Sequence, residues 1–250
     1  MRITRIYSPA TIIPEQPITL SGNAARHVIQ VLRMGPGDSL LLFDGSGYEY
    51  PGTIKNANKS NVEIEVGRPT TPSTESLLRI TLWHGLCRTS RMDSVVQKAT
   101  ELGAAVIQPV TTEFGVIKLE QKRALKKTAH WSNVAISACE QSGRTVPPIV
   151  LPPAPLASCL DAYRRLGERP VAVMLDPSGA PDCLSQLDNL KEIIVLTGPE
   201  GGFSEAEKAA ATAAGFRLAS AGPRILRTET APVVALTLIH SLLGDLRSAR

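Results

Sequence analysis

A strand–helix–strand pattern between residues 79 and 110 constrains the fold of this chain more than any other feature. Two apolar runs, RITLWHG and AVIQPV, flank the segment SRMDSVVQKATELG. In that segment Ser90 and Asp93 have the S-x-x-D spacing of a helix start, and Gly103 stands where the helix would stop. Two strands joined by a helix lie parallel in one sheet, so the pattern predicts an α/β domain.

Further apolar runs extend this domain toward the carboxyl end. Residues 171–175 (VAVML) and 192–196 (EIIVL) have the length and composition of buried strands. A long helix is expected over residues 119–141. We therefore assign residues 73–250 to the α/β domain.

The amino-terminal residues have a different pattern. Residues 67–76 (GRPTTPSTES) are rich in Pro, Thr and Ser, as in a linker. Before them the chain holds short apolar runs, and residues 61–66 (NVEIEV) alternate apolar and polar side chains. One helix, NAARHVIQVLR with Asn23 as its N-cap, interrupts them. Short strands with one helix predict a small β-barrel over residues 1–72; the other expected strands are 3–7, 39–43 and 48–54.

Composition excludes several classes of protein. The net charge of +4 and the pI of about 9.0 are compatible with an RNA partner, and equally with an ordinary surface. The four cysteines are dispersed without a C-x-x-C pair, so we expect no metal site and a reducing compartment. The chain contains no apolar run long enough for a membrane span and no secretory signal pattern. A cytoplasmic protein is expected.

The segment TGPEGGF (197–203) is the first candidate for a binding loop. It follows the run EIIVL, and Ser204 with Glu207 forms a capping box that opens a helix ending at Gly215. Ligands bind at such carboxyl ends of strands. A phosphate fits poorly, because no Lys follows the glycines and Glu200 would repel it. An adenosine ligand with a cationic sulfonium suits the carboxylate. A tight structural turn is the alternative.

The segment GPRILRTETAP (222–232) is the second candidate. It begins with another Gly-Pro turn, carries two arginines around Ile225 and Leu226, and leads into a helix with Pro232 in its first turn. Two Gly-Pro loops therefore open two successive helices.

At this point the chain resembles a known family. GPEGGFSEAE followed by GPRILRTETA is similar to the signature pair of the ribosomal small-subunit RNA methyltransferase E family, in the SPOUT superfamily. Stretches in residues 26–38, 97–113 and 138–148 resemble further family motifs in the same order. The resemblance implies a PUA-like barrel joined to a parallel sheet with a trefoil knot, in a homodimer. It also implies S-adenosylmethionine-dependent methylation of uridine N3 in 16S ribosomal RNA, as free RNA or in the small ribosomal subunit.

Two positions depart from the family pattern. Phe114 stands where the family commonly has Arg after the TE of TTE, so a contact made by that Arg is absent or is made by another cation. Arg91 stands where Lys is frequent, which is a milder change.

The loops and the resemblance together assign the cofactor site. We expect Ile225 and Leu226 to enclose the adenine while backbone groups of the loops read its edge. The predicted cofactor-binding residues are Leu196, Thr197, Gly198, Gly201, Gly202, Gly222, Ile225, Leu226 and Arg227.

Four residues are candidates for the chemistry. Uridine N3–H is a weak acid, so an enzyme helps by removing the proton or by stabilising charge on O2 and O4. Arg227 is expected to stabilise that charge, and Glu229 to act as base or orienter, with a helix-dipole charge as its alternative. Glu140 and Arg144 of ACEQSGR form a second pair that reaches the pocket directly or across the dimer, or else a helix-end salt bridge.

RNA contacts are expected from the barrel. Arg2, Arg5, Arg26 and Arg33 are candidates for gripping phosphates. The basic stretch KLEQKRALKK (118–127) is either a solvated helix face or an RNA-facing ridge. His84 and His240 are expected to be core or surface residues. Two other functions remain open, ribose 2′-O methylation and non-catalytic RNA binding in ribosome assembly.

Overall fold

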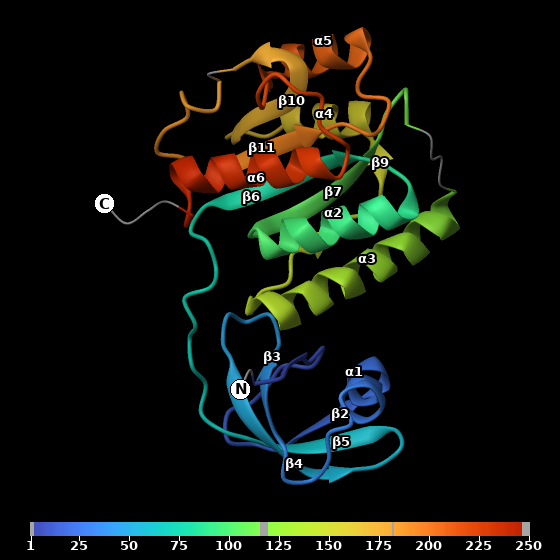
Figure 1. Ribbon diagram of the computed structural model, residues 1–250, viewed down its shortest axis with the longest axis vertical. Helices are drawn as coiled ribbons and strands as arrows, with labels where there is room; N and C mark the ends of the chain where they lie inside the picture. The colour runs from blue at the N-terminus through green and yellow to red at the C-terminus, as the bar shows by residue number, and fades with distance from the viewer. Residues whose placement is uncertain (1–2, 116–119, 182, 247–250) are drawn as a thin grey trace. The chain divides into compact units, whose positions relative to one another are not determined.

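The computed structural model describes residues 3–115, 120–181 and 183–246 (Figure 1). The chain divides into two compact units. The first combines Met1–Glu75 with Ile136–Pro147, and the second combines Ser76–Ala135 with Pro148–Arg250. The first unit therefore includes a segment from the middle of the chain, a feature that the linker at residues 67–76 does not reveal.

The first unit is a curled, mixed five-stranded sheet. Its strand order is β1-β3-β4-β5-β2, in which β1 and β3 are parallel and the other pairs antiparallel. Among the described residues the edge strands β1 and β2 do not pair with each other, so the sheet is a half-barrel rather than a closed barrel. The strands are β1 (Arg5–Tyr7), β2 (Ile18–Ser21), β3 (Ser39–Phe43), β4 (Tyr50–Ala57) and β5 (Asn61–Val66).

Alternation along β5 builds the core of this unit. Val62, Ile64 and Val66 are buried between exposed or half-buried polar neighbours, as predicted. The short helix α1 (Gly22–Arg26) begins after Ser21 rather than at the predicted cap Asn23, and it continues as one π-helical turn, η1 (His27–Val31). Strand β2 was not predicted from the sequence, because its four residues give too short a pattern.

The second unit contains a seven-stranded sheet in which every recorded strand pair is parallel, as predicted. Its strand order is β12-β10-β11-β6-β7-β8, with β9 paired to β7. The strands are β6 (Arg79–Gly85), β7 (Ala104–Thr111), β8 (Ile149–Val150), β9 (Ala154–Pro155), β10 (Val171–Ala180), β11 (Glu192–Thr197) and β12 (Arg217–Ala219). Because β6, β10 and β11 are parallel neighbours, their carboxyl ends meet at one edge.

Helices cover both faces of this sheet. On β11, Ile193 and Val195 belong to the core with α2, α3 and α6, whereas Ile194 and Leu196 pack with α4 and α5. Strand residues that are apolar at every position are expected when a sheet is buried on both faces. The helices are α2 (Thr89–Glu101), α3 (Gln121–Ser142), α4 (Leu156–Arg164), α5 (Glu205–Ala214) and α6 (Thr230–Leu243), labelled in Figure 1.

The predicted helix signals have mixed outcomes. The capping box of Ser204 and Glu207 is present, with Gly215 left-handed at φ 103° after α5. Gly103 ends α2 at φ 79°. The predicted cap of α2 is wrong, because α2 begins after Arg88 without a side-chain cap. Asp93 instead accepts a hydrogen bond from Trp131 Nε1 at 3.1 Å, so its carboxylate bonds to α3 rather than to the first turn of α2.

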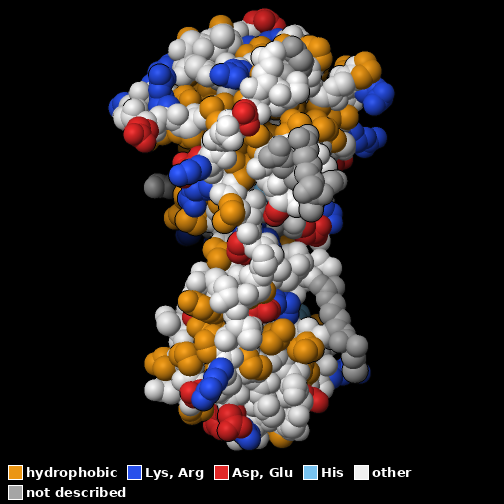
Figure 2. Space-filling view, turned by 90° about the vertical axis from the view of Figure 1, so that its left-hand side faces the viewer, with side chains coloured by type: hydrophobic (Ala, Val, Ile, Leu, Met, Phe, Trp, Pro, Cys, Tyr) orange, Lys and Arg blue, Asp and Glu red, His pale blue; other side chains and the backbone are white. Residues whose placement is uncertain are grey.

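Charged side chains of both signs lie on the surface of the molecule (Figure 2). Lys and Arg side chains are interspersed with Asp and Glu on the face that Figure 2 shows. Among the described residues, no helix combines the length and the apolar character that crossing a bilayer requires. The trefoil knot stays a prediction of the family resemblance.

Candidate functional site: a pocket between two glycine-containing loops

A pocket lies at the carboxyl edge of the second unit's sheet. Residues of β10, the segment directly after β11 and the loops that lead into α5 and α6 line it. Its empty space is about 660 Å³, a volume that includes open solvent at its entrance. The lining residues are Leu175, Asp176, Pro177, Gly198, Pro199, Glu200, Gly202, Phe203, Ala221, Gly222, Arg224, Ile225, Leu226, Thr228 and Ala231.

The predicted cofactor residues fall into two groups. Five of them line this pocket: Gly198, Gly202, Gly222, Ile225 and Leu226. Leu196 and Thr197 are fully buried at the end of β11, below the described lining. Arg227 is exposed outside that lining, and its carbonyl oxygen accepts the amides of Thr230 and Ala231 at the start of α6.

Close backbone approaches shape the first loop. A Cβ at Gly85, the last residue of β6, would lie 2.3 Å from Pro199 Cδ. A Cβ at Gly201 would lie 2.8 Å from Phe114 Cβ and 2.9 Å from the Phe114 carbonyl oxygen. Gly201 therefore faces the segment after β7 and not the described lining of the pocket. Phe114 contributes its Cβ and its carbonyl oxygen to this contact, while the residue as a whole is about half exposed.

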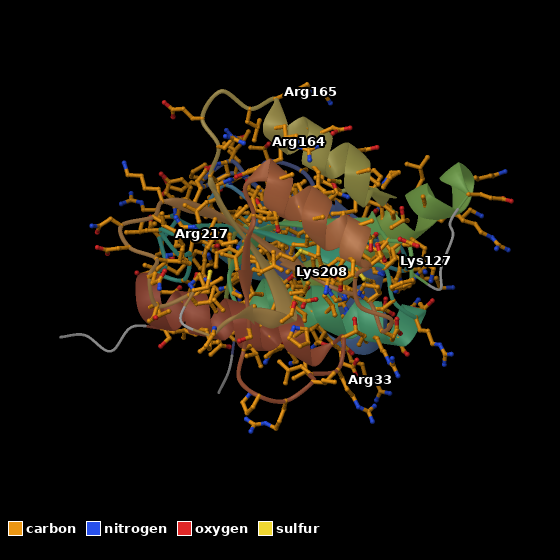
Figure 3. The ribbon with its side chains drawn as sticks, turned by 90° about the horizontal axis from the view of Figure 1, so that it is seen from above. Arg33, Lys127, Arg164, Arg165, Lys208 and Arg217 are labelled. Atoms are coloured by element: carbon orange, nitrogen blue, oxygen red, sulfur yellow. The ribbon has the colours of Figure 1, made fainter. Side chains whose placement is uncertain are left out.

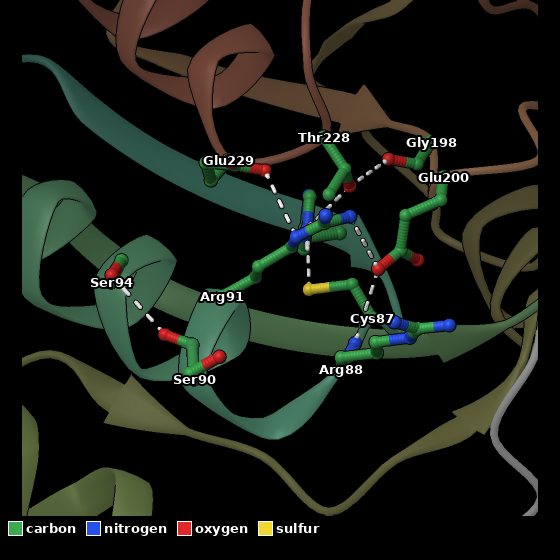
Figure 4. A network of polar contacts seen from close by, with 10 residues as sticks. Cys87, Arg88, Ser90, Arg91, Ser94, Gly198, Glu200, Thr228 and Glu229 are labelled. Atoms are coloured by element: carbon green, nitrogen blue, oxygen red, sulfur yellow. Dashed lines mark hydrogen bonds and ion pairs between the residues drawn. The ribbon is translucent and has the colours of Figure 1, made fainter.

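The two loops are joined by a hydrogen bond. Thr228 Oγ1, from the second loop, donates to the carbonyl oxygen of Gly198 in the first loop at 2.8 Å. Beneath them His84 of β6 lies 2.7 Å from Thr197 Oγ1 through Nδ1, and 3.5 Å from Thr228 Oγ1 through Nε2. Its Nε2 also lies 3.7 Å from Cys87 Sγ. Figure 4 shows the contact between Thr228 and Gly198 from close by.

Burial dominates the titration of the two groups under the loops. Complete burial lowers the pKa of His84 from 6.5 to about 4, against the opposing charge of Glu200. Burial, together with the charges of Glu200 and Glu229, raises the pKa of the Cys87 thiol to about 12. Both groups are therefore neutral at pH 7.

Glu200 is tied to the start of α2. Its Oε1 accepts hydrogen bonds from Arg91 Nη1 at 3.0 Å and from the Arg88 amide at 3.3 Å (Figure 4). Partial burial raises the pKa of the Glu200 carboxyl, but its own amide, the Arg88 amide and the Arg91 charge outweigh burial and lower it. The carboxylate is thus ionised at neutral pH, on the pocket wall.

Arg91 connects both loops. Besides its contact with Glu200, its Nε lies 3.7 Å from Glu229 Oε2 at the start of α6. The predicted catalytic partner Glu229 therefore pairs with Arg91 in this structure, and Glu229 makes no side-chain cap bond to α6. An Arg at position 91 presents two nitrogens to two carboxylates, which a single Lys ammonium does less readily.

Asp176 is a site residue that the sequence analysis missed. It is buried at the pocket, where Oδ1 accepts the Ser178 amide at 2.9 Å, and Lys208 Nζ lies 3.8 Å from Oδ1. Figure 3 labels Lys208 on α5. The signal was present: Asp-Pro-Ser-Gly follows the buried run VAVML, so a carboxylate and a turn stand at a strand's carboxyl end. Leu175, Pro177 and Arg224 also line the pocket without having been predicted.

Glu140 and Arg144 lie in the first unit rather than in the described lining of the pocket. Glu140 Oε1 accepts the Tyr7 amide at 3.1 Å, and burial raises the pKa of its carboxyl. Arg144 Nη2 lies 2.8 Å from Glu75 Oε2. The Arg144 guanidinium is thus paired with Glu75, and a role of Glu140 and Arg144 in the chemistry stays a prediction.

The four predicted RNA-binding arginines have different surroundings. Arg5 is enclosed: it forms an ion pair with Glu49, donates to the Arg144 carbonyl oxygen at 3.1 Å and lies 5.1 Å from the Phe43 ring centre. Arg26 and Arg33 are exposed. Arg2 lies outside the described residues. Of the basic stretch 118–127, the described Lys127 donates to Thr89 Oγ1 at 3.2 Å. The described residues contain no cluster of three metal-ligating side chains.

Comparison with known families defines the class of protein. Residues 74–240 match the family described as RNA methyltransferase domain, and residues 20–67 match the family described as RNA methyltransferase PUA domain. Both matches lie in the order that the two units have along the chain.

Similar proteins narrow the class to one family. The chain is 32% identical to the ribosomal RNA small subunit methyltransferase E of Buchnera aphidicola from Schizaphis graminum, with 98% of each chain covered. It is 31% identical to that of Bacillus subtilis, with 91% of each covered. The chain belongs to the ribosomal RNA small subunit methyltransferase E family.

Two solved structures agree over the full length. One from Neisseria gonorrhoeae, a ribosomal RNA small subunit methyltransferase E bound to S-adenosyl methionine, superimposes with a TM-score of 0.89 at 35% identity and covers 98% of this chain and 99% of its own. One from Legionella pneumophila, in complex with the cofactor SAM, gives 0.92 at 35% identity and covers 98% and 100%.

Proposed function

We propose that this protein transfers the methyl group of S-adenosylmethionine to N3 of a uridine in 16S ribosomal RNA. The observation that carries the proposal is the pocket between the two loops, in a chain that matches ribosomal RNA small subunit methyltransferase E relatives over its full length. When bound, S-adenosylmethionine supplies an electrophilic methyl group on a cationic sulfur.

The pocket's residues fit this cofactor better than a phosphate ligand. The helix α5 would offer an anion site at its amino end, but Ser204 Oγ already accepts the Glu207 amide and Glu207 Oε2 accepts the Ser204 amide. Two carboxylates, Asp176 and Glu200, line the pocket, and both favour a cation over an anion. Apolar side chains of Leu226 and Phe203 with loop backbone groups suit an adenosine.

The chain's arginines supply the charge that the reaction needs. Removal of the N3 proton leaves negative charge on the uracil ring, which a guanidinium stabilises. Arg227 is exposed on the second loop, and Arg224 lines the pocket mouth. We assign charge stabilisation to Arg227. Glu229, held 3.7 Å from Arg91, acts as an orienting group for the second loop. A target base that is paired or stacked must be extruded to reach the pocket.

Mass spectrometry of 16S RNA tests this function. A strain that lacks the gene should have lost one N3-methyluridine, and the wild-type gene should restore it. The Arg227→Ala variant should restore it poorly, whereas Arg227→Lys should restore part of it, because the charge is kept. An unchanged N3-methyluridine signal in the deletion strain, or loss of a 2′-O-methyl group instead, contradicts the proposal. A protein with no affinity for S-adenosylmethionine would instead support a non-catalytic role in ribosome assembly.

We also propose a cytoplasmic homodimer, with a PUA-like domain drawn mainly from residues 1–72 and a methyltransferase domain drawn mainly from residues 73–250, of which residues 136–147 pack with the first unit. Apolar side chains near the second loop support a dimer: Ile225 is 88% exposed and Leu238 of α6 is 38% exposed. Sedimentation equilibrium should give twice the mass of 26.7 kDa. A monomer at micromolar concentration contradicts the dimer and leaves the methyl transfer proposal untouched.

A further inference from the structure

The buried side chain of His84 occupies a position that the proposed reaction does not use directly. It lies at the end of β6, with no exposed surface, and is not among the described residues that line the pocket. In the sheet it stands beside Thr197, its register partner on β11. Its second ring nitrogen faces Thr228 of the other loop. One side chain therefore contacts the roots of both loops.

The hydrogen-bond directions in this group follow from chemistry. Thr228 Oγ1 donates its one hydrogen to the Gly198 carbonyl oxygen, so toward His84 it can act only as an acceptor. We assign the ring hydrogen of His84 to Nε2, which lies 3.5 Å from Thr228 Oγ1 and 3.7 Å from Cys87 Sγ. In a neutral imidazole Nδ1 is consequently an acceptor, and the Thr197 hydroxyl, 2.7 Å away, donates to it.

These directions form one chain of donors, from Thr197 through His84 and Thr228 to the carbonyl of Gly198. Each member has its acceptor only if the next member is oriented correctly. In sequence, Thr197 lies 113 positions after His84, and Thr228 lies 144 positions after it. Because Gly198 and Thr228 both line the pocket, this series of hydrogen bonds ends on the pocket wall.

We infer that His84 is a positioning residue for the cofactor: its neutral ring holds the two loops at the spacing that S-adenosylmethionine requires. The inference rests on the proposed function, because it concerns the same pocket. Loss of the ring would leave the Thr228 hydroxyl free to turn away from Gly198 and would leave the Thr197 hydroxyl without its acceptor. The loops then lose their common anchor, although no group that lines the pocket has been changed.

The first experiment compares His84→Leu with His84→Gln in the full-length protein. Leu keeps apolar bulk and removes both polar atoms, whereas the Gln amide offers one donor and one acceptor in place of the ring nitrogens. Calorimetric titration with S-adenosylmethionine should show about tenfold weaker binding for His84→Leu, in line with one or two hydrogen bonds at roughly 1 kcal/mol each. His84→Gln should stay within about threefold of the wild-type affinity.

The second experiment asks whether the hydrogen bonds from Thr197 to Gly198 act as one unit. Thr228→Val removes the donor to Gly198, and Thr228→Ser keeps it. We expect Thr228→Val to weaken S-adenosylmethionine binding about three- to tenfold, and Thr228→Ser to leave it within about twofold. The double variant His84→Leu with Thr228→Val should bind no more than about twofold worse than the weaker single variant, because both changes break the same chain.

A separate measurement distinguishes positioning from general stability. Affinity for a 16S RNA fragment without cofactor should be the same in all of these variants, and only S-adenosylmethionine binding should change. Equal cofactor affinity for His84→Leu and wild type, additive effects in the double variant, or a parallel loss of RNA affinity would each overturn the inference. If the wild-type protein itself fails to bind S-adenosylmethionine, the proposed function fails instead.

Discussion

At the scale of single residues, the two carboxylates of the loops are held by one guanidinium. Glu200 contacts Arg91 Nη1, and Glu229 lies near Arg91 Nε. The sequence pointed to an acidic residue in a glycine-containing loop and to a cationic ligand. The structure adds that this acid is already paired and ionised, so it shapes the loop as well as the charge of the pocket wall. Nothing in the local sequence pairs residues 91 and 200, which are 109 positions apart.

The first prediction concerns the pH dependence of stability. The pKa of His84 is 6.5 when unfolded and about 4 when folded, so between these values only the unfolded chain takes up the proton. The free energy of unfolding therefore has its full value above pH 6.5 and falls as the pH is lowered toward 4. The difference between the two pKa values of His84 corresponds to a loss of about 3 kcal/mol, at roughly 1.36 kcal/mol per pKa unit. Urea unfolding of the wild type between pH 7 and pH 4.5 should show this loss.

The matched control for this prediction is His84→Gln, which does not titrate in that range. The other groups around the ring are the Thr197 and Thr228 hydroxyls, the Cys87 thiol with its pKa near 12, and the Glu200 carboxylate, whose charge opposes the shift. The variant's stability should therefore depend less on pH between 6.5 and 4.5. Parallel profiles for the two proteins would contradict the assignment.

At the scale of elements, the loop before α5 depends on its neighbours as well as on its glycines. Gly201 meets the backbone of Phe114, and the Glu113 amide donates to Glu207 Oε1 at 2.8 Å. The capping box of α5 is therefore also the attachment point for the end of β7. The helix and its cap were predictable because they follow from local spacing. The partner segment was not, since it lies 94 positions earlier in the chain.

The second prediction is that Gly201→Val abolishes S-adenosylmethionine binding while the fold is retained. The added Cβ would overlap Phe114 Cβ and its carbonyl oxygen, and backbone atoms cannot rotate away as a side-chain end can. The loop must shift, and it carries Gly198, Glu200 and Gly202 of the pocket. Gly167→Val is the control, because a Cβ there meets nothing within 4 Å. Calorimetry and far-ultraviolet circular dichroism make the comparison; unchanged affinity in Gly201→Val would show that the loop does not form the site.

The third prediction concerns the cap itself. Ser204→Ala removes the acceptor of the Glu207 amide and should lower the free energy of unfolding by about 1 kcal/mol. Ser204→Thr keeps a hydroxyl acceptor and should cost less. Chemical denaturation of both variants measures the difference. If Ala and Thr are equally tolerated, the cap contributes nothing at this site.

At the scale of the whole molecule, the amino-terminal unit is discontinuous in sequence. Residues 136–147 belong to it: Glu140 accepts a hydrogen bond from the Tyr7 amide, and Arg144 forms an ion pair with Glu75. The linker at 67–76 marks the change in pattern along the chain but not this return. The parallel sheet of the second unit, in contrast, was predictable, because strands joined by helices have few alternative arrangements.

The fourth prediction tests this discontinuity. A fragment of residues 1–75 lacks the acceptor of the Tyr7 amide and the partners of Arg5 and Glu75 in residues 136–147, so it should be less stable than the same unit in the intact chain. Addition of a peptide of residues 134–148 should raise its melting temperature. Amide dispersion in heteronuclear spectra and thermal unfolding monitor both effects. The prediction is contradicted if the fragment has the same melting temperature as the first unit in the intact protein and if the peptide does not change it.

The sequence by itself determined the parallel sheet, the half-buried strands of the first unit, the capping box before α5 and the two loops that line the pocket. These features depend on periods of two or 3.6 residues and on motifs of a few adjacent positions, which a chain displays before it folds. Only the tertiary structure decided that Asp176 joins the pocket, that Arg91 pairs with Glu200 and Glu229, and that His84 contacts both loops. Such contacts join residues more than 100 positions apart in several cases, and they exist because parallel neighbouring strands bring their carboxyl ends to one edge.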